Sequence, residues 1–135
     1  MTLYEHLLLC DKCFFPELSS RVNLHDYSRK LVSSAVNFEA WQDHQLVGLV
    51  AAYLNAPDKH TAFVTNVSVL PTFVGKGIAK ELIQQCIDHV QAQQFKELAL
   101  EVSDGNQPAI RLYRNVGFKN KGEMNGYITM HLNLV

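Results

Sequence analysis

Apolar and polar positions follow one another along the chain in a pattern that predicts both strands and helices. A nearly unbroken apolar run at residues 46–54 has the length and composition of a strand that is covered on both faces, and residues 62–70 predict a second buried strand. Between residues 75 and 91, apolar side chains recur at the spacing of one wide helical stripe. The remaining pattern predicts strands at 37–43, 98–102 and 127–134 and helices at 23–36 and 106–116. Together these elements predict a single α/β domain over residues 1–135, with a mixed central sheet flanked by helices.

The N-terminal segment is less decisive. Residues 3–13 fit either a helix or a short first strand, and the pattern leaves both open. Phe14-Phe15-Pro16 predicts an extended or turn segment, because a residue before proline avoids helical angles. Asn23 is a suitable N-cap for the helix that follows, since its short side chain can accept a hydrogen bond from a main-chain N–H.

Composition and charge narrow the class of protein. An apolar share of 47% and a charged share of 19% are typical of a packed core and not of a disordered chain. The formal net charge of −1 gives no overall basic field for nucleic acid or for an anionic membrane surface. The sequence contains neither a signal peptide pattern nor an apolar run near the roughly 20 residues that span a bilayer, so we expect a soluble, cytoplasmic protein.

The three cysteines raise the question of redox or metal chemistry. Cys10 and Cys13 have the CxxC spacing of thiol redox motifs and zinc sites. A structural zinc site needs a second pair of ligands, and the six histidines are scattered. The pair lies in an apolar N-terminal stretch and does not join a strand to a helix, while Cys86 falls on the apolar stripe of the long helix. We interpret all three as structural thiols and expect no metal.

The segment around Gly75 and Gly77 joins a buried strand to the long helix and is the most informative part of the chain. Glycines let the main chain approach a ligand closely, and the first N–H groups of a helix have no internal acceptors. With the helix dipole and the charges of Lys76 and Lys80, this junction predicts a phosphate or pyrophosphate site. It fails the P-loop pattern and matches only the first two glycines of the GxGxxG dinucleotide pattern. A glycine-rich helix start without a ligand is the alternative.

Two motifs resemble those of the GNAT superfamily of N-acetyltransferases. Residues 74–79, Val-Gly-Lys-Gly-Ile-Ala, are similar to its Arg/Gln-x-x-Gly-x-Gly/Ala signature and match it at Gly77 and Ala79, while Val74 replaces the usual Arg or Gln. The second motif, N-x-x-A-x-x-L-Y-x-x-x-G-F, is matched at every named position, by Asn106, Ala109, Leu112, Tyr113, Gly117 and Phe118. The two motifs occur in the family's order, and the resemblance covers roughly residues 37–134.

The resemblance implies a GNAT-like (acyl-CoA N-acyltransferase) fold and direct transfer of acetyl from acetyl-CoA, as co-substrate, to a primary amine of a small molecule or peptide. It implies that Tyr113 lies beside the cofactor sulfur as general acid and that Asn106 binds the pantetheine arm. The cofactor-binding residues that it implies are Val67, Ser68, Val69, Val74, Gly75, Lys76, Gly77, Ile78, Ala79, Lys80, Asn106 and Tyr113. A non-catalytic domain that binds acetyl-CoA as a sensor or scaffold is the alternative.

The general base and the acceptor are less well defined. Glu101 is the preferred base because its strand leads to the helix of Tyr113, and a chain of water molecules is the alternative; the other candidates are Glu39, Asp43 and His60. The family builds its acceptor pocket from regions that here contain Phe14, Phe15, Arg21, Tyr27, Asn125 and Tyr127. Arg21 has two interpretations that the sequence leaves open: it pairs with an acidic group of the substrate, or it is an ordinary surface arginine. By analogy with this fold, the alternating segment 127–134 could form a homodimer.

Overall fold

A single six-stranded sheet forms the centre of the molecule in the computed structural model, which describes residues 1–14 and 16–135. The strand order is β1-β2-β3-β4-β6-β5, and all neighbours in this sheet are antiparallel except β3 and β4. The strands are β1 (Val36–Gln42), β2 (Gln45–Tyr53), β3 (Thr61–Val69), β4 (Glu97–Ser103), β5 (Lys119–Met124) and β6 (Tyr127–Asn133). The α-helices are α1 (Leu3–Cys10), α2 (Leu24–Ser34), α3 (Ile78–Ala92) and α4 (Gln107–Asn115).

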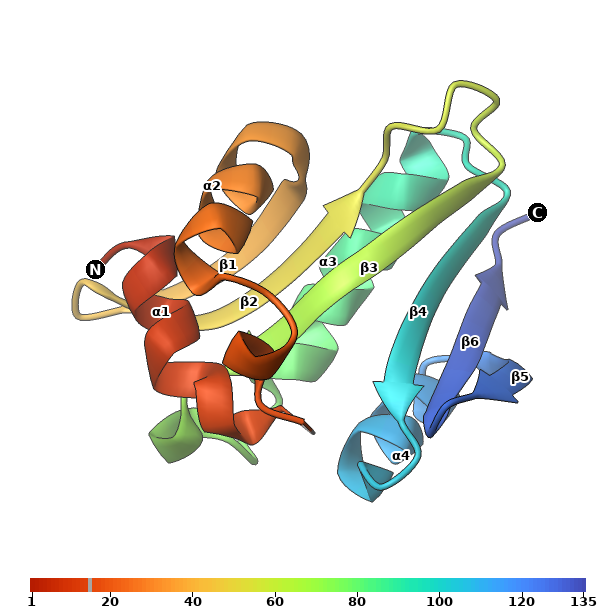
Figure 1. The fold of residues 1–135 in the computed structure, drawn as a ribbon. Helices are drawn as coiled ribbons and strands as arrows, with labels where there is room; N and C mark the ends of the chain where they lie inside the picture. The colour runs from red at the N-terminus through yellow and green to blue at the C-terminus, as the bar shows by residue number, and fades with distance from the viewer. Residues whose placement is uncertain (15) are drawn as a thin grey trace.

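The helices form a layer on each face of the sheet. Figure 1 shows α1 and α2 on one face, α3 on the opposite face, and α4 beyond the end of β4. The stripe of α3 that includes Leu82, Ile83 and Cys86 packs into one apolar cluster with the sheet, and Leu7 and Leu31 of α1 and α2 pack into another. Burial on both sides explains why β2 is an almost continuous apolar run. The predicted mixed α/β fold is therefore confirmed.

The N-terminal segment is helical, which answers the question that its sequence left open. Thr2 and Glu5 form a capping box, in which the Thr2 hydroxyl accepts from the Glu5 main-chain N–H at 3.1 Å and the Glu5 carboxylate accepts from the Thr2 main-chain N–H at 3.3 Å. A 3₁₀ helix, Asp11–Cys13, continues α1. The Asn23 cap on α2 is confirmed by a 3.0 Å hydrogen bond from the main-chain N–H of Asp26. Phe15, in the predicted turn, lies outside the described residues.

The structure differs from the sequence-based prediction at one strand and at one helix boundary. The strand β5 was not predicted, because all six of its residues are exposed and its sequence, Lys-Asn-Lys-Gly-Glu-Met, has no buried face to create an alternating pattern. Helix α3 begins at Ile78 and not at residue 75, because Gly75 and Gly77 both have φ of 79°, which is left-handed and outside a right-handed helix. Within the described residues, no helix is long and apolar enough to cross a membrane.

The strands β3 and β4 are paired along only part of their length. Their parallel register runs from Thr61 opposite Glu97 to Val64 opposite Leu100, and beyond that point the two strands diverge (Figure 1). At the same point β3 has a bulge against β2, because Val64 and Asn66 pair with consecutive β2 residues and the residue between them is left over. The sheet therefore opens between the second half of β3 and the end of β4.

Candidate active site

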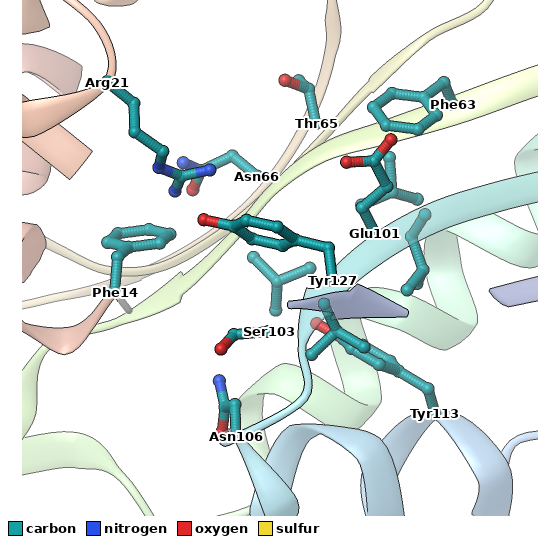
Figure 2. Close-up of a pocket in the computed structure, with 14 residues that line it drawn as sticks. Phe14, Arg21, Phe63, Thr65, Asn66, Glu101, Ser103, Asn106, Tyr113 and Tyr127 are labelled. Atoms are coloured by element: carbon teal, nitrogen blue, oxygen red, sulfur yellow. The ribbon is translucent and has the colours of Figure 1, made fainter. Parts of the chain in front are cut away.

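A cavity of about 230 Å³ lies at this opening. Its walls are residues 63–67 of β3 and residues 100–103 of β4, with Asn106 and Tyr113 from α4 and with Phe14, Arg21 and Tyr127 from the surrounding segments (Figure 2). Four residues that the sequence singled out for cofactor binding or catalysis thus meet in one place: Val67, Glu101, Asn106 and Tyr113.

The second half of β3 presents main-chain groups to the opening. The Leu70 N–H donates to the main-chain O of Val47 on the β2 side at 2.9 Å. Successive residues of a strand direct their main-chain groups to opposite sides, so those of Val67 and Val69 face away from β2. Because β4 has already diverged there, these N–H groups have no neighbouring strand to bind in the part of the chain that the structure describes. Such groups are suited to an extended, amide-containing ligand.

Tyr113 reaches the cavity from α4 and is itself 6% exposed. Its ring packs edge-on against Phe118, with the ring centroids 6.0 Å apart. Burial raises the pKa of Tyr113 above its ordinary value near 10, so the phenol keeps its proton at neutral pH. Figure 2 shows its hydroxyl directed into the cavity. A protonated phenol in this position can donate a proton to an anion that forms in the cavity.

Asn106 is the N-cap of α4 and also lines the cavity. Its side-chain oxygen accepts from the main-chain N–H of Ala109 at 3.3 Å. This hydrogen bond orients the amide, and its nitrogen is directed toward the cavity (Figure 2). Helix capping and ligand contact are therefore compatible at this residue.

The junction before α3 has the geometry of an anion site. The first main-chain hydrogen bond of the helix is donated by Glu81 to Gly77 at 3.1 Å, so the N–H groups of Ile78, Ala79 and Lys80 have no acceptor within the helix. A Cβ atom built on Gly75 or Gly77 would meet nothing within 4 Å, so the space beside both glycines is open. Open N–H groups and the positive end of the helix dipole favour a phosphate group.

The side chains around this junction are exposed. Val74, at the position of the family's Arg or Gln, is 61% exposed, and the Lys76 ammonium lies 5.1 Å from the centroid of the Phe73 ring. Lys80 is exposed on the first turn of α3. None of residues 74–80 lines the cavity, so the open N–H groups before α3 and the cavity are two separate features.

Ser68 has a different environment from Val67 and Val69. Its hydroxyl is buried between His6 Nε2 and Asn66 Oδ1, at 2.8 Å from each. His6 Nδ1 donates to the main-chain O of Leu46 at 2.7 Å. Burial lowers the pKa of His6, which keeps the imidazole neutral. The hydrogen bond between His6 and Ser68 links α1 to the strand that forms the cavity wall, so it helps to position that wall.

The other sequence-based candidates are distributed as follows. The Glu39 carboxylate accepts from Trp41 Nε1 at 3.0 Å on β1, Asp43 lies in the β1–β2 turn, and His60 precedes β3; none of the three lines the cavity. Tyr27 supports the bulge from outside the cavity through its hydroxyl, 2.8 Å from Thr65 Oγ1. Asn125 is in the β5–β6 turn and is not part of the lining, while Phe15 is outside the described residues.

Sequence reasoning missed Thr65, Asn66 and Ser103, which line the cavity but belong to no motif.

The three cysteines differ in their burial. All three are free thiols, Cys10 and Cys86 are fully buried, and burial raises the pKa of each of these two to about 12. Cys13 is exposed. Thiols that hold their protons so firmly are unreactive, and the structural interpretation is supported for Cys10 and Cys86.

Comparisons with known proteins show relatives in sequence and in fold. N-acetylaspartate synthetase of Danio rerio is 34% identical over 83 residues, which are 62% of this chain and 29% of that protein. Two solved structures share the fold, each over 97% of this chain. The ribosomal-protein-S18-alanine N-acetyltransferase of Escherichia coli has a TM-score of 0.77 at 20% identity over 84% of its chain. The PaiA N-acetyltransferase of Thermoplasma acidophilum, in complex with coenzyme A, has a TM-score of 0.76 at 17% identity over 90% of its chain.

The chain spans between 29% and 53% of the length of three curated relatives that it matches. The model of the acetyltransferase (GNAT) family matches residues 1–118, which include both motifs and most of the cavity wall. A match over so much of the sequence, on the same fold, shows that this chain belongs to the acetyltransferase (GNAT) family.

Proposed function

We propose that the chain transfers an acetyl group from acetyl-CoA to a primary amine by direct attack of the amine on the thioester. The observation that carries the proposal is the opening between β3 and β4, which has unpaired main-chain N–H groups on one wall and the Tyr113 hydroxyl on the other. Two further points support it. The related fold from Thermoplasma acidophilum was solved with coenzyme A, and the relatives named above carry the names of enzymes that acetylate amines.

In this proposal the N–H groups before α3 bind the diphosphate, and those of Val67 and Val69 bind the amide-containing arm. A β3 N–H also polarises the thioester carbonyl, in the manner of an oxyanion hole. The amine nitrogen bonds to the carbonyl carbon, and the carbon–sulfur bond then breaks. Tyr113 gives its proton to the departing sulfur. The amine's surplus proton passes to Glu101, directly or through water.

The test is release of free thiol from acetyl-CoA in the presence of a broad set of amines, with Tyr113→Phe as the variant. Loss of a general acid lowers kcat by about a hundredfold or more. The Kd for coenzyme A should change by less than about twofold, because the ring and its packing against Phe118 remain. Equal kcat in the two proteins would remove Tyr113 from the chemistry. Tight binding of acetyl-CoA with no turnover of any amine would instead indicate the sensor or scaffold.

A further inference from the structure

Arg21 stands at the edge of the cavity on a firmly held turn. The turn is the 3₁₀ helix Leu18–Ser20, and the Arg21 N–H donates to the main-chain O of Leu18 at 3.0 Å. Leu18 is buried in the cluster beneath α1 and α2. The Asp11 carboxylate binds Ser19 through its main-chain N–H and its hydroxyl, each at 2.6 Å. Packing and hydrogen bonds thus fix the position from which the Arg21 side chain extends.

The guanidinium of Arg21 has no acidic partner in the described part of the chain. The ion pairs found there both use Glu97, and Asp11 is occupied by Ser19. The guanidinium carbon lies 5.8 Å from the centroid of the Tyr127 ring. Arginine stays charged at physiological pH, and its planar donors match a carboxylate through two parallel hydrogen bonds. A cation held over a cavity with its donors open favours an anionic group on the ligand.

The opposite wall carries the complementary charge. Glu101 lines the same cavity and forms no ion pair with the described residues, and Figure 2 shows it on the far side of Tyr127 from Arg21. A ligand with both an ammonium and a carboxylate matches both walls, whereas a polyamine would bring like charge to Arg21. The diphosphate is not the expected partner of Arg21, because residues 74–80 lie outside the cavity.

We propose that the acceptor is a small amine that carries its own carboxylate, such as a free amino acid, and that Arg21 binds this carboxylate while the amine faces Glu101. This inference rests on the proposed function, since it names the acceptor of the same site. It makes Arg21 the residue that determines specificity for acid over amide.

Matched acceptors test the proposal. Glycine, alanine and aspartate are each compared with their α-amides, which keep the same amine and side chain but lack the charge. The acid should be preferred by roughly tenfold or more in kcat/KM, mainly through KM, as expected for a charged hydrogen-bonded pair that is partly exposed. The amine of an α-amide is less basic than the amine of the corresponding acid, so a larger fraction of it is neutral and able to attack. This difference in basicity favours the amide, so it does not explain a preference for the acid. Equal kcat/KM for acid and amide in the wild-type protein would overturn it.

The variant Arg21→Gln should lower kcat/KM for the acid by roughly tenfold and leave the amide nearly unchanged. Arg29→Gln is the matched control, because Arg29 is an exposed arginine of α2 outside the cavity lining. Both variants should keep the wild-type Kd for coenzyme A. An equal loss on acid and amide in Arg21→Gln would refute recognition of a carboxylate, and faster turnover of peptide N-termini than of any amino acid would point to a peptide acceptor instead.

Calorimetry decides the same point without turnover. N-acetylalanine should bind the coenzyme A-loaded protein more tightly than N-acetylalaninamide does, and Arg21→Gln should remove the difference. Equal or undetectable binding of the two would overturn the acceptor proposal alone. Failure to bind coenzyme A at all would overturn the proposed function.

Discussion

A carboxylate introduced at residue 77 would stand where the diphosphate of acetyl-CoA is proposed to bind. Gly77 has φ of 79°, a conformation that most residues adopt only with strain. Asp and Asn are the side chains that tolerate it best, and both also serve as N-caps. Space is not limiting, because a Cβ atom on Gly77 would meet nothing within 4 Å. Gly77→Asp and Gly77→Asn therefore form a pair that differs in charge and hardly in shape.

The magnitude follows from the geometry. Two unit charges about 5 Å apart interact by about 0.8 kcal/mol in water and about 3 kcal/mol at the effective dielectric constant near a protein surface. The diphosphate carries more than one charge, and the introduced carboxylate would also accept hydrogen bonds from the α3 N–H groups that the phosphates need. Since 1.4 kcal/mol is tenfold in affinity, Gly77→Asp should weaken coenzyme A binding at least tenfold relative to Gly77→Asn.

The assay is titration calorimetry with coenzyme A at two salt concentrations, after circular dichroism has shown that both variants are folded. The difference between Asp and Asn should shrink at high salt, because exposed charges are screened. An aspartate variant that binds coenzyme A as tightly as the asparagine variant would show that the diphosphate is not bound at the start of α3.

Two further predictions concern the scaffold. A Cβ atom on Gly48 of β2 would approach Ile78 Cγ2 to 2.5 Å, so Gly48→Ala should lower the free energy of unfolding by about 1–3 kcal/mol and weaken coenzyme A binding by displacing the start of α3. Gly122→Ala on exposed β5, where a Cβ atom meets nothing, is the control in urea unfolding, and equal effects of the two would contradict the packing argument. His6 is buried with its pKa lowered by that burial, although the hydrogen bond with Leu46, the charge of Glu39 and the hydrogen bond with Ser68 act in the opposite direction. Below about pH 6.5 the unfolded chain therefore takes up a proton that the folded chain does not, and the free energy of unfolding should fall by up to about 1.4 kcal/mol per pH unit as the pH decreases. His6→Asn should be less stable at neutral pH but lack this slope, whereas exposed His25→Asn should keep it; the same slope in both variants would refute the assignment.

The parts of the fold that the sequence predicts well are those with a strong periodic signal. The buried strand β2 and the stripe of α3 are long enough and apolar enough to be recognised without tertiary information, and β3 alternates between buried and half-buried residues along its length. The helix α1 was ambiguous because its leucines do not lie on one face: Leu7 is fully buried, while Leu8 and Leu9 are 48% and 54% exposed. The strand β5 is held by main-chain pairing with β6, and main-chain pairing leaves no pattern in the side chains.

The residues of the candidate site also fall into two groups, those that the sequence can identify and those that it cannot. Tyr113, Asn106 and the glycines before α3 belong to local motifs, so their sequence neighbours identify them. The bulge of β3 depends on its register with β2, and the contact between His6 and Ser68 joins residues 62 positions apart. No local pattern can predict such contacts. Arg21 could be named from the sequence, but only its place over the cavity and the lack of an acidic partner among the described residues distinguish it from an ordinary surface arginine.

The most direct test of where the cofactor binds is titration of ¹⁵N-labelled protein with coenzyme A, followed by the main-chain amide signals in NMR spectra. The proposed arrangement predicts the largest shifts at Val67 and Val69 and at residues 78–80, with smaller changes at the amides of α1 and α2. Shifts confined to α1 and α2, with the amides of β3 and of the first turn of α3 unchanged, would contradict it.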